Sequence, residues 1–238
     1  MRQWFAATAA ALALCTLGIG SARAGTFTDT FDSGASSLWG NERGNWTVTD
    51  GNYGATFPDD APVNASSSSS LPFLLSDFSV DLDINNIQDG GVWLRSAEDA
   101  GTALGRTGVL LVTGGLGGVG TGLYWHIVTD GNNAGSILNP IDGLFDPGIT
   151  DASIRVEVVG DTYSAFLNDS STPVTTLVTD VFSSGQVALF NSNSGQTFDS
   201  FGVESSDIAS TVPEPSSAIL FALMGAGVVV RYRSRDRQ

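Results

Sequence analysis

Short apolar runs separated by small polar residues fill the chain from residue 25 to residue 212. No stretch there keeps the 3.6-residue apolar period of an amphipathic helix, and glycine, serine, threonine, asparagine and aspartate interrupt the apolar runs throughout. Residues 78–85 alternate strictly, so Phe78, Val80, Leu82 and Ile84 are expected to face a core. This pattern predicts an all-β domain.

Four pairs of aspartate and glycine mark the expected hairpin turns. They are Asp50-Gly51, Asp89-Gly90, Asp130-Gly131 and Gly160-Asp161, each between β-rich segments. Two-residue hairpin turns require positive φ, which these residue types tolerate. About a dozen strands in about 185 residues fit one large sandwich better than two domains.

The first 24 residues have the organisation of a secretory signal peptide. A charged start precedes the apolar residues 5–19, and the small residues Ala22 and Ala24 predict cleavage by signal peptidase before Gly25. The apolar stretch is shorter than the roughly 20 residues of a membrane anchor, which is the alternative. Cleavage would remove Cys15, the only cysteine of the chain.

The last 27 residues combine a proline motif, an apolar segment and a basic tail. Val212, Pro213, Glu214 and Pro215 precede the uncharged residues 216–230, and four arginines lie within residues 231–238. The apolar segment is a marginal transmembrane helix of about 22 Å, with its basic tail expected in the cytoplasm.

This order of features resembles the PEP-CTERM sorting signal of Gram-negative bacteria. The resemblance implies processing by an exosortase at the cell envelope, in organisms that make exopolysaccharide. The protein is therefore expected to cross the inner membrane and reach the envelope, cell surface or extracellular matrix, with transient anchoring in the membrane. A plain C-terminal anchor is the alternative.

Three parts of the exported region share a second recognisable pattern. They are the opening residues 26–32 and 44–51, the central residues 77–80 with Gly91-Val92-Trp93-Leu94-Arg95, and the closing residues 156–163, 185–190 and 198–203. The pattern resembles concanavalin A-like, laminin G-like jelly rolls, in the subgroup of fructan-binding modules and 3-keto-disaccharide hydrolases. It implies a jelly-roll β-sandwich over residues 25–204, followed by a linker at residues 205–211.

Four side chains form the predicted carbohydrate site. Trp93 and Arg95 are two residues apart and are expected on one strand face, as are Tyr124 and His126. Aromatic rings stack on the CH faces of sugars, while arginine and histidine bond sugar hydroxyls. The alternatives are core packing for the aromatic rings, a structural hydrogen bond for His126 and a buried carboxylate partner for Arg95.

Asp81, Asp83 and Asn85 have the one-three-five spacing of a calcium loop. Asn86 stands where an EF-hand needs glycine and Val92 where it needs glutamate, so an EF-hand is excluded. A looser structural Ca²⁺ site remains open beside the alternative of a solvated strand face. No other cofactor is expected.

The sequence assigns no catalytic residues and favours a protein that is not an enzyme. Residues 115–120 fit GxGxxG, but the β-branched and aromatic residues after them predict a strand, whereas a dinucleotide site needs a helix there. The Glu-x-Asp-x-Glu strand of laminarinase-type jelly rolls is absent from the sequence. One cysteine and one histidine are too few for a His/Cys zinc site or a Cys-His nucleophile pair.

The charge of the exported region further restricts the classes of ligand that the protein is expected to bind. Residues 25–212 hold four arginines, no lysine and 23 acidic residues, a formal charge of −19. This excludes a nucleic-acid partner and favours neutral sugars over anionic ones unless calcium bridges them. We therefore expect an exported protein that binds extracellular polysaccharide. A glycoside hydrolase and a structural matrix protein without a small ligand are the alternatives.

Overall fold

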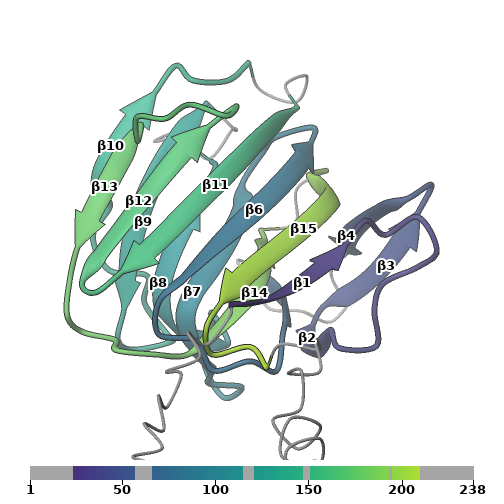
Figure 1. Cartoon of the computed structure of the whole chain (residues 1–238), viewed down its shortest axis with the longest axis horizontal. Helices are drawn as coiled ribbons and strands as arrows, with labels where there is room; N and C mark the ends of the chain where they lie inside the picture. Colours follow the sequence, from purple (N-terminus) through teal and green to yellow (C-terminus); the bar gives the residue numbers. More distant parts are fainter. Residues whose placement is uncertain (1–23, 57–65, 115–120, 147–150, 193–194, 210–238) are drawn as a thin grey trace, which may run out of the picture.

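The computed structural model describes residues 24–56, 66–114, 121–146, 151–192 and 195–209 (Figure 1). Ala22, residues 115–120, the motif at 212–215 and the segment at 216–230 lie outside these ranges. Within them the structure is entirely strands, turns and loops, which confirms the all-β prediction. The ranges contain no helix of the length and hydrophobicity needed to cross a membrane.

The described strands form two antiparallel sheets that lie face to face (Figure 1). One sheet has eight strands in the order β13-β12-β11-β6-β15-β4-β3, with β1 also paired to β15. Its strands are β1 (Gly25–Asp29), β3 (Asn45–Thr49), β4 (Asn52–Thr56), β6 (Phe78–Asn85), β11 (Ala152–Val159), β12 (Thr162–Leu167), β13 (Thr175–Val178) and β15 (Thr197–Ser205).

The other sheet has seven strands in the order β10-β9-β8-β7-β14-β5-β2. They are β2 (Gly40–Arg43), β5 (Ser67–Ser70), β7 (Gly90–Glu98), β8 (Arg106–Val112), β9 (Gly122–Val128), β10 (Leu138–Asp142) and β14 (Gln186–Asn191). Both sheets pair strands that are distant in sequence, such as β6 with β15 and β7 with β14, so the two sheets form a single sandwich.

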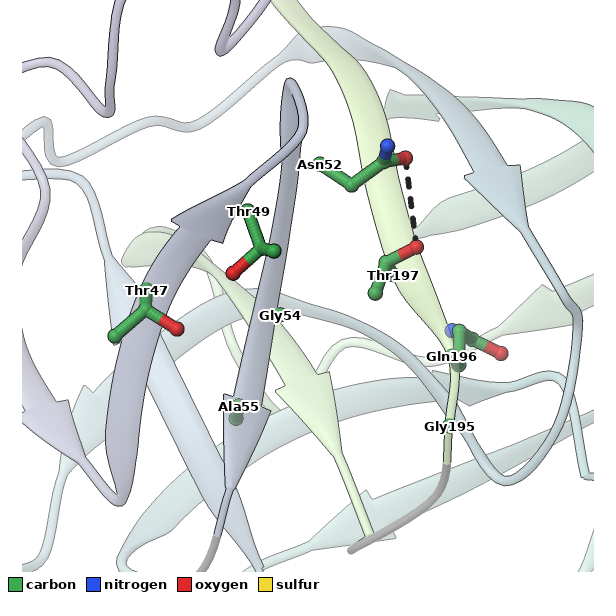
Figure 2. A pocket seen from close by; sticks show the side chains of 8 residues that line it. All are labelled: Thr47, Thr49, Asn52, Gly54, Ala55, Gly195, Gln196 and Thr197. Atoms are coloured by element: carbon green, nitrogen blue, oxygen red, sulfur yellow. Dashed lines mark hydrogen bonds between the residues drawn. The ribbon is translucent and has the colours of Figure 1, made fainter.

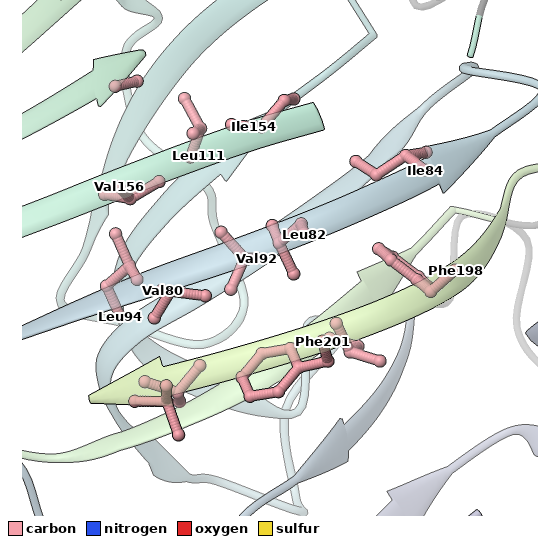
Figure 3. Close-up of a cluster of buried hydrophobic side chains, with 14 of the residues drawn as sticks. Val80, Leu82, Ile84, Val92, Leu94, Leu111, Ile154, Val156, Phe198 and Phe201 are labelled. Atoms are coloured by element: carbon pink, nitrogen blue, oxygen red, sulfur yellow. The ribbon is translucent and has the colours of Figure 1, made fainter. Parts of the chain in front are cut away.

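The main core fills the space between the two sheets (Figure 3). Val80, Leu82 and Ile84 of β6 enter it and are at most 2% exposed, as their alternation predicts. Val92 of β7 and Leu111 of β8 meet them from the seven-stranded sheet. Each such side chain stabilises the fold by about 1.5–3 kcal/mol through burial.

Two of the four predicted turns are two-residue hairpins. Asp50-Gly51 joins β3 to β4, with φ of 51° and 78°, and Gly160-Asp161 joins β11 to β12. The other two predictions are wrong. Asp89-Gly90 lies at the start of β7, which belongs to a different sheet from β6, and Asp130-Gly131 lies in the nine-residue connection from β9 to β10.

Candidate functional site

The outer face of the seven-stranded sheet carries its own hydrophobic cluster. Alternate residues of β7, β8, β9 and β14 point away from the main core and pack together there. We call this group the outer cluster: Trp93, Leu110, Val112, Tyr124, Val128, Ala188 and Phe190. It contains two of the four residues predicted to bind carbohydrate.

Trp93 belongs to the outer cluster and is fully buried. Its ring meets Phe190 edge to face, with 6.3 Å between the centroids. Its indole Nε1–H is buried without a hydrogen-bond partner. A buried donor left unpaired costs about 1–3 kcal/mol. The ring is therefore not the open stacking platform that the sequence predicted, because the face is covered.

Tyr124 and His126 share the outer face of β9, as predicted, and their rings contact edge to face at 5.2 Å. His126 Nδ1 lies 3.0 Å from the carbonyl oxygen of Ser136. Burial lowers the pKa of His126, partly offset by the carbonyls of Ser136 and Ala134. A neutral ring whose Nδ1–H donates to Ser136 has Nε2 available as an acceptor.

Burial also raises the pKa of Tyr124 to about 12, with a smaller contribution from the Asp89 carboxylate. The Tyr124 hydroxyl is therefore protonated at neutral pH and able to donate a hydrogen bond. Tyr124 and His126 are each less than 10% exposed, so this part of the face is covered as well.

Arg95 does not share a face with Trp93, so this prediction is wrong. The register between β7 and β8 shifts between Leu94 and Ala97, and Arg95 adopts a left-handed φ of 45°. A bulge of this kind inserts one residue and turns the next side chain to the other face. Arg95 therefore points to the main-core side, with its guanidinium 5.4 Å from the centre of the Tyr163 ring.

The bonds of Arg95 are structural. Its guanidinium donates to the carbonyl of Ser76 at 2.6 and 2.8 Å and to the carbonyl of Phe182 at 2.9 Å. It also pairs with Asp77 at 3.3 Å, although that carboxylate is 62% exposed. Arg95 thus ties the β7 bulge to the segments before β6 and after β13.

The arginine that does lie on the outer face is Arg106, which the sequence reasoning missed. Arg106 and Leu110 are four residues apart on β8 and therefore point to the same face, and Arg106 is fully buried. Its Nε donates to Ser96 Oγ at 3.1 Å and its Nη2 to Gln186 Oε1 at 2.8 Å. Its Nη1 has no hydrogen-bond partner, and no carboxylate in the described ranges forms an ion pair with it.

Burial lowers the pKa of Arg106 to about 10, and the nearby Glu98 carboxylate acts in the opposite direction. The side chain therefore remains a cation at neutral pH. Its sequence context offered no signal, because one of its two partners, Gln186, lies 80 residues away on β14.

The connection from β7 to β8 crosses the outer face like a strap. We define the strap as residues 99–105. The Leu104 side chain packs on the outer cluster. The Leu104 carbonyl accepts a bond from Ser66 Oγ at 2.9 Å, and its N–H donates to the Gly131 carbonyl at 2.6 Å. Ser66 precedes β5 and Gly131 follows β9, so the strap is fastened on both sides of the central strands.

The predicted calcium ligands lie on the outer face of the eight-stranded sheet. Burial is the main cause that raises the pKa of Asp81, opposed by Arg155. Asp83 accepts hydrogen bonds from Ser153 and, at 2.6 Å, from Ser200. Asn85 donates to Asn52 at 2.6 Å. Nowhere in the described ranges do three His, Cys, Asp or Glu residues form a group able to hold a metal.

Two shallow grooves open on this second face. One, of about 220 Å³, lies between the β3–β4 hairpin and the start of β15 (Figure 2). Its lining has no charged residue: Thr47, Thr49, Asn52, Gly54, Ala55, Gly195, Gln196 and Thr197. The other, of about 270 Å³, includes the predicted ligands Asp83 and Asn85 together with Asp151. Neither groove has an aromatic ring for sugar stacking.

Comparisons with solved structures place the fold among lectin-like sandwiches. The carbohydrate-binding module CBM66 from Bacillus subtilis is 19% identical over 71% of this chain and 92% of the module, with a TM-score of 0.50. Peanut lectin with a 9mer peptide is 15% identical over 76% of this chain and 97% of the lectin, with a TM-score of 0.53.

The exoplasmic/lumenal domain of VIP36, in its Ca²⁺/Man3GlcNAc-bound form, is 10% identical over 76% of this chain and 87% of that domain, with a TM-score of 0.50. No protein-family model matches the chain, and the search of curated proteins found no match. The fold is therefore a concanavalin A-like jelly-roll sandwich, which confirms the predicted fold class.

Proposed function

We propose that this domain binds carbohydrate on the outer face of its seven-stranded sheet. The observation that carries the proposal is the unpaired Trp93 Nε1–H, buried among aromatic rings. A hydroxyl-rich ligand supplies the acceptor that this donor lacks. The likeness to a carbohydrate-binding module and to lectins supports the same class of ligand, although fold by itself does not establish function.

Each residue on the outer face has a separate role in the proposed binding of a sugar. Trp93 and Tyr124 offer ring surfaces for the CH groups of a sugar, and their polar atoms are donors. His126 Nε2 is an acceptor for a sugar hydroxyl. Leu104 covers the cluster, so binding requires the strap to move away from the face, and the sugar ring then takes the place of the leucine side chain.

A glycan array with the purified protein and two tryptophan variants tests the proposal. Trp93→Phe keeps most of the buried ring but removes the unpaired donor. We expect this variant to lose binding and to lose less stability than the control below, since both changes leave a cavity but only the control also loses a hydrogen bond. The matched control is Trp125→Phe in the main core, where Nε1 donates to Thr175 Oγ1 at 3.2 Å. This variant should lose stability and retain binding.

Three results would contradict the proposal. Binding that survives Trp93→Phe would place the sugar elsewhere, and the groove of Figure 2 is then the next candidate. The absence of binding to any glycan would favour a structural matrix protein. Turnover of an arrayed glycoside would indicate a hydrolase.

We also propose that the protein is exported and sorted at the envelope through residues 212–238, with an exosortase recognising Val212-Pro213-Glu214-Pro215. The support is the order of motif, apolar segment and arginine-rich tail in the sequence. Mass spectrometry of the protein recovered from cells tests this. We expect a new C-terminus near the motif and an N-terminus at Gly25. Exported protein that keeps its intact tail would show that the segment is a plain anchor.

A further inference from the structure

Arg106 sets the outer face apart from an ordinary hydrophobic surface. A buried ion normally has an ion-pair partner, because the loss of hydration costs several kcal/mol. Arg155 pairs with Glu157, and Arg95 pairs with Asp77. Arg106 is fully buried and forms no ion pair within the described ranges, in a region with 23 acidic residues.

The N–H groups of Arg106 that lack an acceptor determine which chemical group a ligand must supply. Its five N–H groups have two recorded acceptors, Ser96 Oγ and Gln186 Oε1, and Nη1 has none. Both acceptors are neutral, and the Glu98 carboxylate, opposite Arg106 on β7, forms no ion pair with it, so no group in direct contact balances the charge of the guanidinium. A carboxylate supplies the missing negative charge and bonds the planar guanidinium with two oxygens at once.

Arg106 also lies beside the proposed sugar site. It follows directly on the strap, whose Leu104 packs on the outer cluster. Arg106 is on the same face of β8 as Leu110. Its Nε donates to Oγ of Ser96, which lies on β7 just beyond the bulge that follows Trp93. Movement of the strap for a ligand at Trp93 therefore opens the way to Arg106.

We propose that Arg106 makes this an acidic-sugar site, in which the guanidinium binds the carboxylate of a uronic acid residue. The inference rests on the carbohydrate-binding function proposed above. It reverses the preference for neutral sugars that follows from the charge of −19, because that charge acts at long range through solvent. A buried guanidinium acts at contact distance and is screened much less.

Calorimetric titration with matched acidic and neutral ligands tests the inference. The probes are oligomers of galacturonate, mannuronate and glucuronate, each with its methyl ester, which has the same sugar without the charge. We expect at least one uronate to bind about tenfold or more tightly than its ester. The difference should persist in 0.5 M NaCl, because salt screens a contact between a buried guanidinium and a carboxylate much less than it screens charges that interact through solvent.

Two arginine variants identify the residue responsible. Arg106→Gln should abolish the discrimination between acid and ester without lowering the melting temperature, because it removes an unbalanced buried charge. Arg95→Gln should lower the melting temperature and keep the discrimination. If Arg106→Gln fails to fold, Gln186→Ala serves instead, since it removes one acceptor that orients the guanidinium and should reduce the discrimination.

The outcomes separate this inference from the proposed function. Equal binding of acids and esters, or discrimination that persists in Arg106→Gln, would overturn the role of Arg106 while leaving carbohydrate binding intact. Binding of neutral sugars alone, lost in Trp93→Phe, would also overturn the role of Arg106 and leave carbohydrate binding intact. The absence of binding to every acidic, esterified and neutral sugar would overturn both.

Discussion

Two buried arginines show how differently the same residue type acts in one sandwich. Arg95 is surrounded by carbonyl oxygens and joins three segments, so its charge is used to hold the structure together. Arg106 has two neutral acceptors and a free Nη1. Lowering its pKa from 12.5 to about 10 corresponds to roughly 3 kcal/mol of destabilisation at neutral pH. A fold retains such a group at a cost to stability when function needs it.

His126 gives the domain a pH dependence that can be measured. Burial lowers its pKa below 6.5, so the folded state binds the proton less well than the unfolded chain. Its contribution to stability is present above pH 6.5 and is lost as the pH falls through the folded pKa. Acidification from pH 7.5 to pH 5 should therefore lower the free energy of unfolding.

Calorimetric melting of the protein and of His126→Gln across this pH range checks the prediction. The variant should lose less stability on acidification. Asp81 and Asp89 have raised pKa values and act in the opposite direction, but they are present in both proteins and their effect cancels in the comparison. An equal loss of stability on acidification in the protein and in His126→Gln would contradict the role of His126 in this pH dependence.

At the scale of the elements, two local irregularities of β7 shape the candidate site. The bulge at Arg95 changes which side chains reach the outer face. Gly91, with a φ of 142°, allows the start of β7 to approach β8 so closely that an added Cβ would collide with the Leu111 carbonyl. The strap then returns the chain over the face, so one connection both joins the strands and covers the site.

Gly91→Ala should destabilise the domain by about 2 kcal/mol or more, because β7 must shift or the backbone must strain. Gly101→Ala in the strap is the matched control. A Cβ there meets no atom within 4 Å, so its effect should stay within about 0.5 kcal/mol. Urea denaturation measures both. Equal stability of the two variants would show that the close approach of β7 to β8 is not required.

At the scale of the whole molecule, the charge of −19 on residues 25–212 dominates behaviour in solution. Like charges on the surface of the domain repel one another, and salt screens this repulsion over about 10 Å at 0.1 M. The same field slows the approach of acidic sugars without preventing a contact at Arg106. Overall charge and local recognition therefore act at different distances.

Raising NaCl from about 10 mM to about 0.5 M should increase the melting temperature by several degrees, because screening relieves this repulsion. Melting in CaCl₂ of equal ionic strength is the control. We expect the same increase, since Ser153 and Ser200 already bond the Asp83 carboxylate. A clearly larger increase in CaCl₂ would show a calcium site, and no effect of NaCl would contradict the repulsion argument.

The sequence by itself determined the features that depend on neighbouring residues. Alternation over residues 78–85 identified the core face of β6, and two Asp/Gly pairs located the hairpin turns of β3–β4 and β11–β12. Side-chain period and turn conformation are local properties, so a single segment is enough to predict them. The jelly-roll class was also predicted correctly.

Only the tertiary structure decided which residues meet on the candidate site. The bulge that turns Arg95 away breaks the two-residue period on which the sequence prediction relied. The group around Arg106 assembles from β7, β8 and β14, and the strap packs Leu104 against the outer cluster. These contacts join segments up to 80 residues apart, and their geometry follows from sheet pairing, which local patterns do not specify.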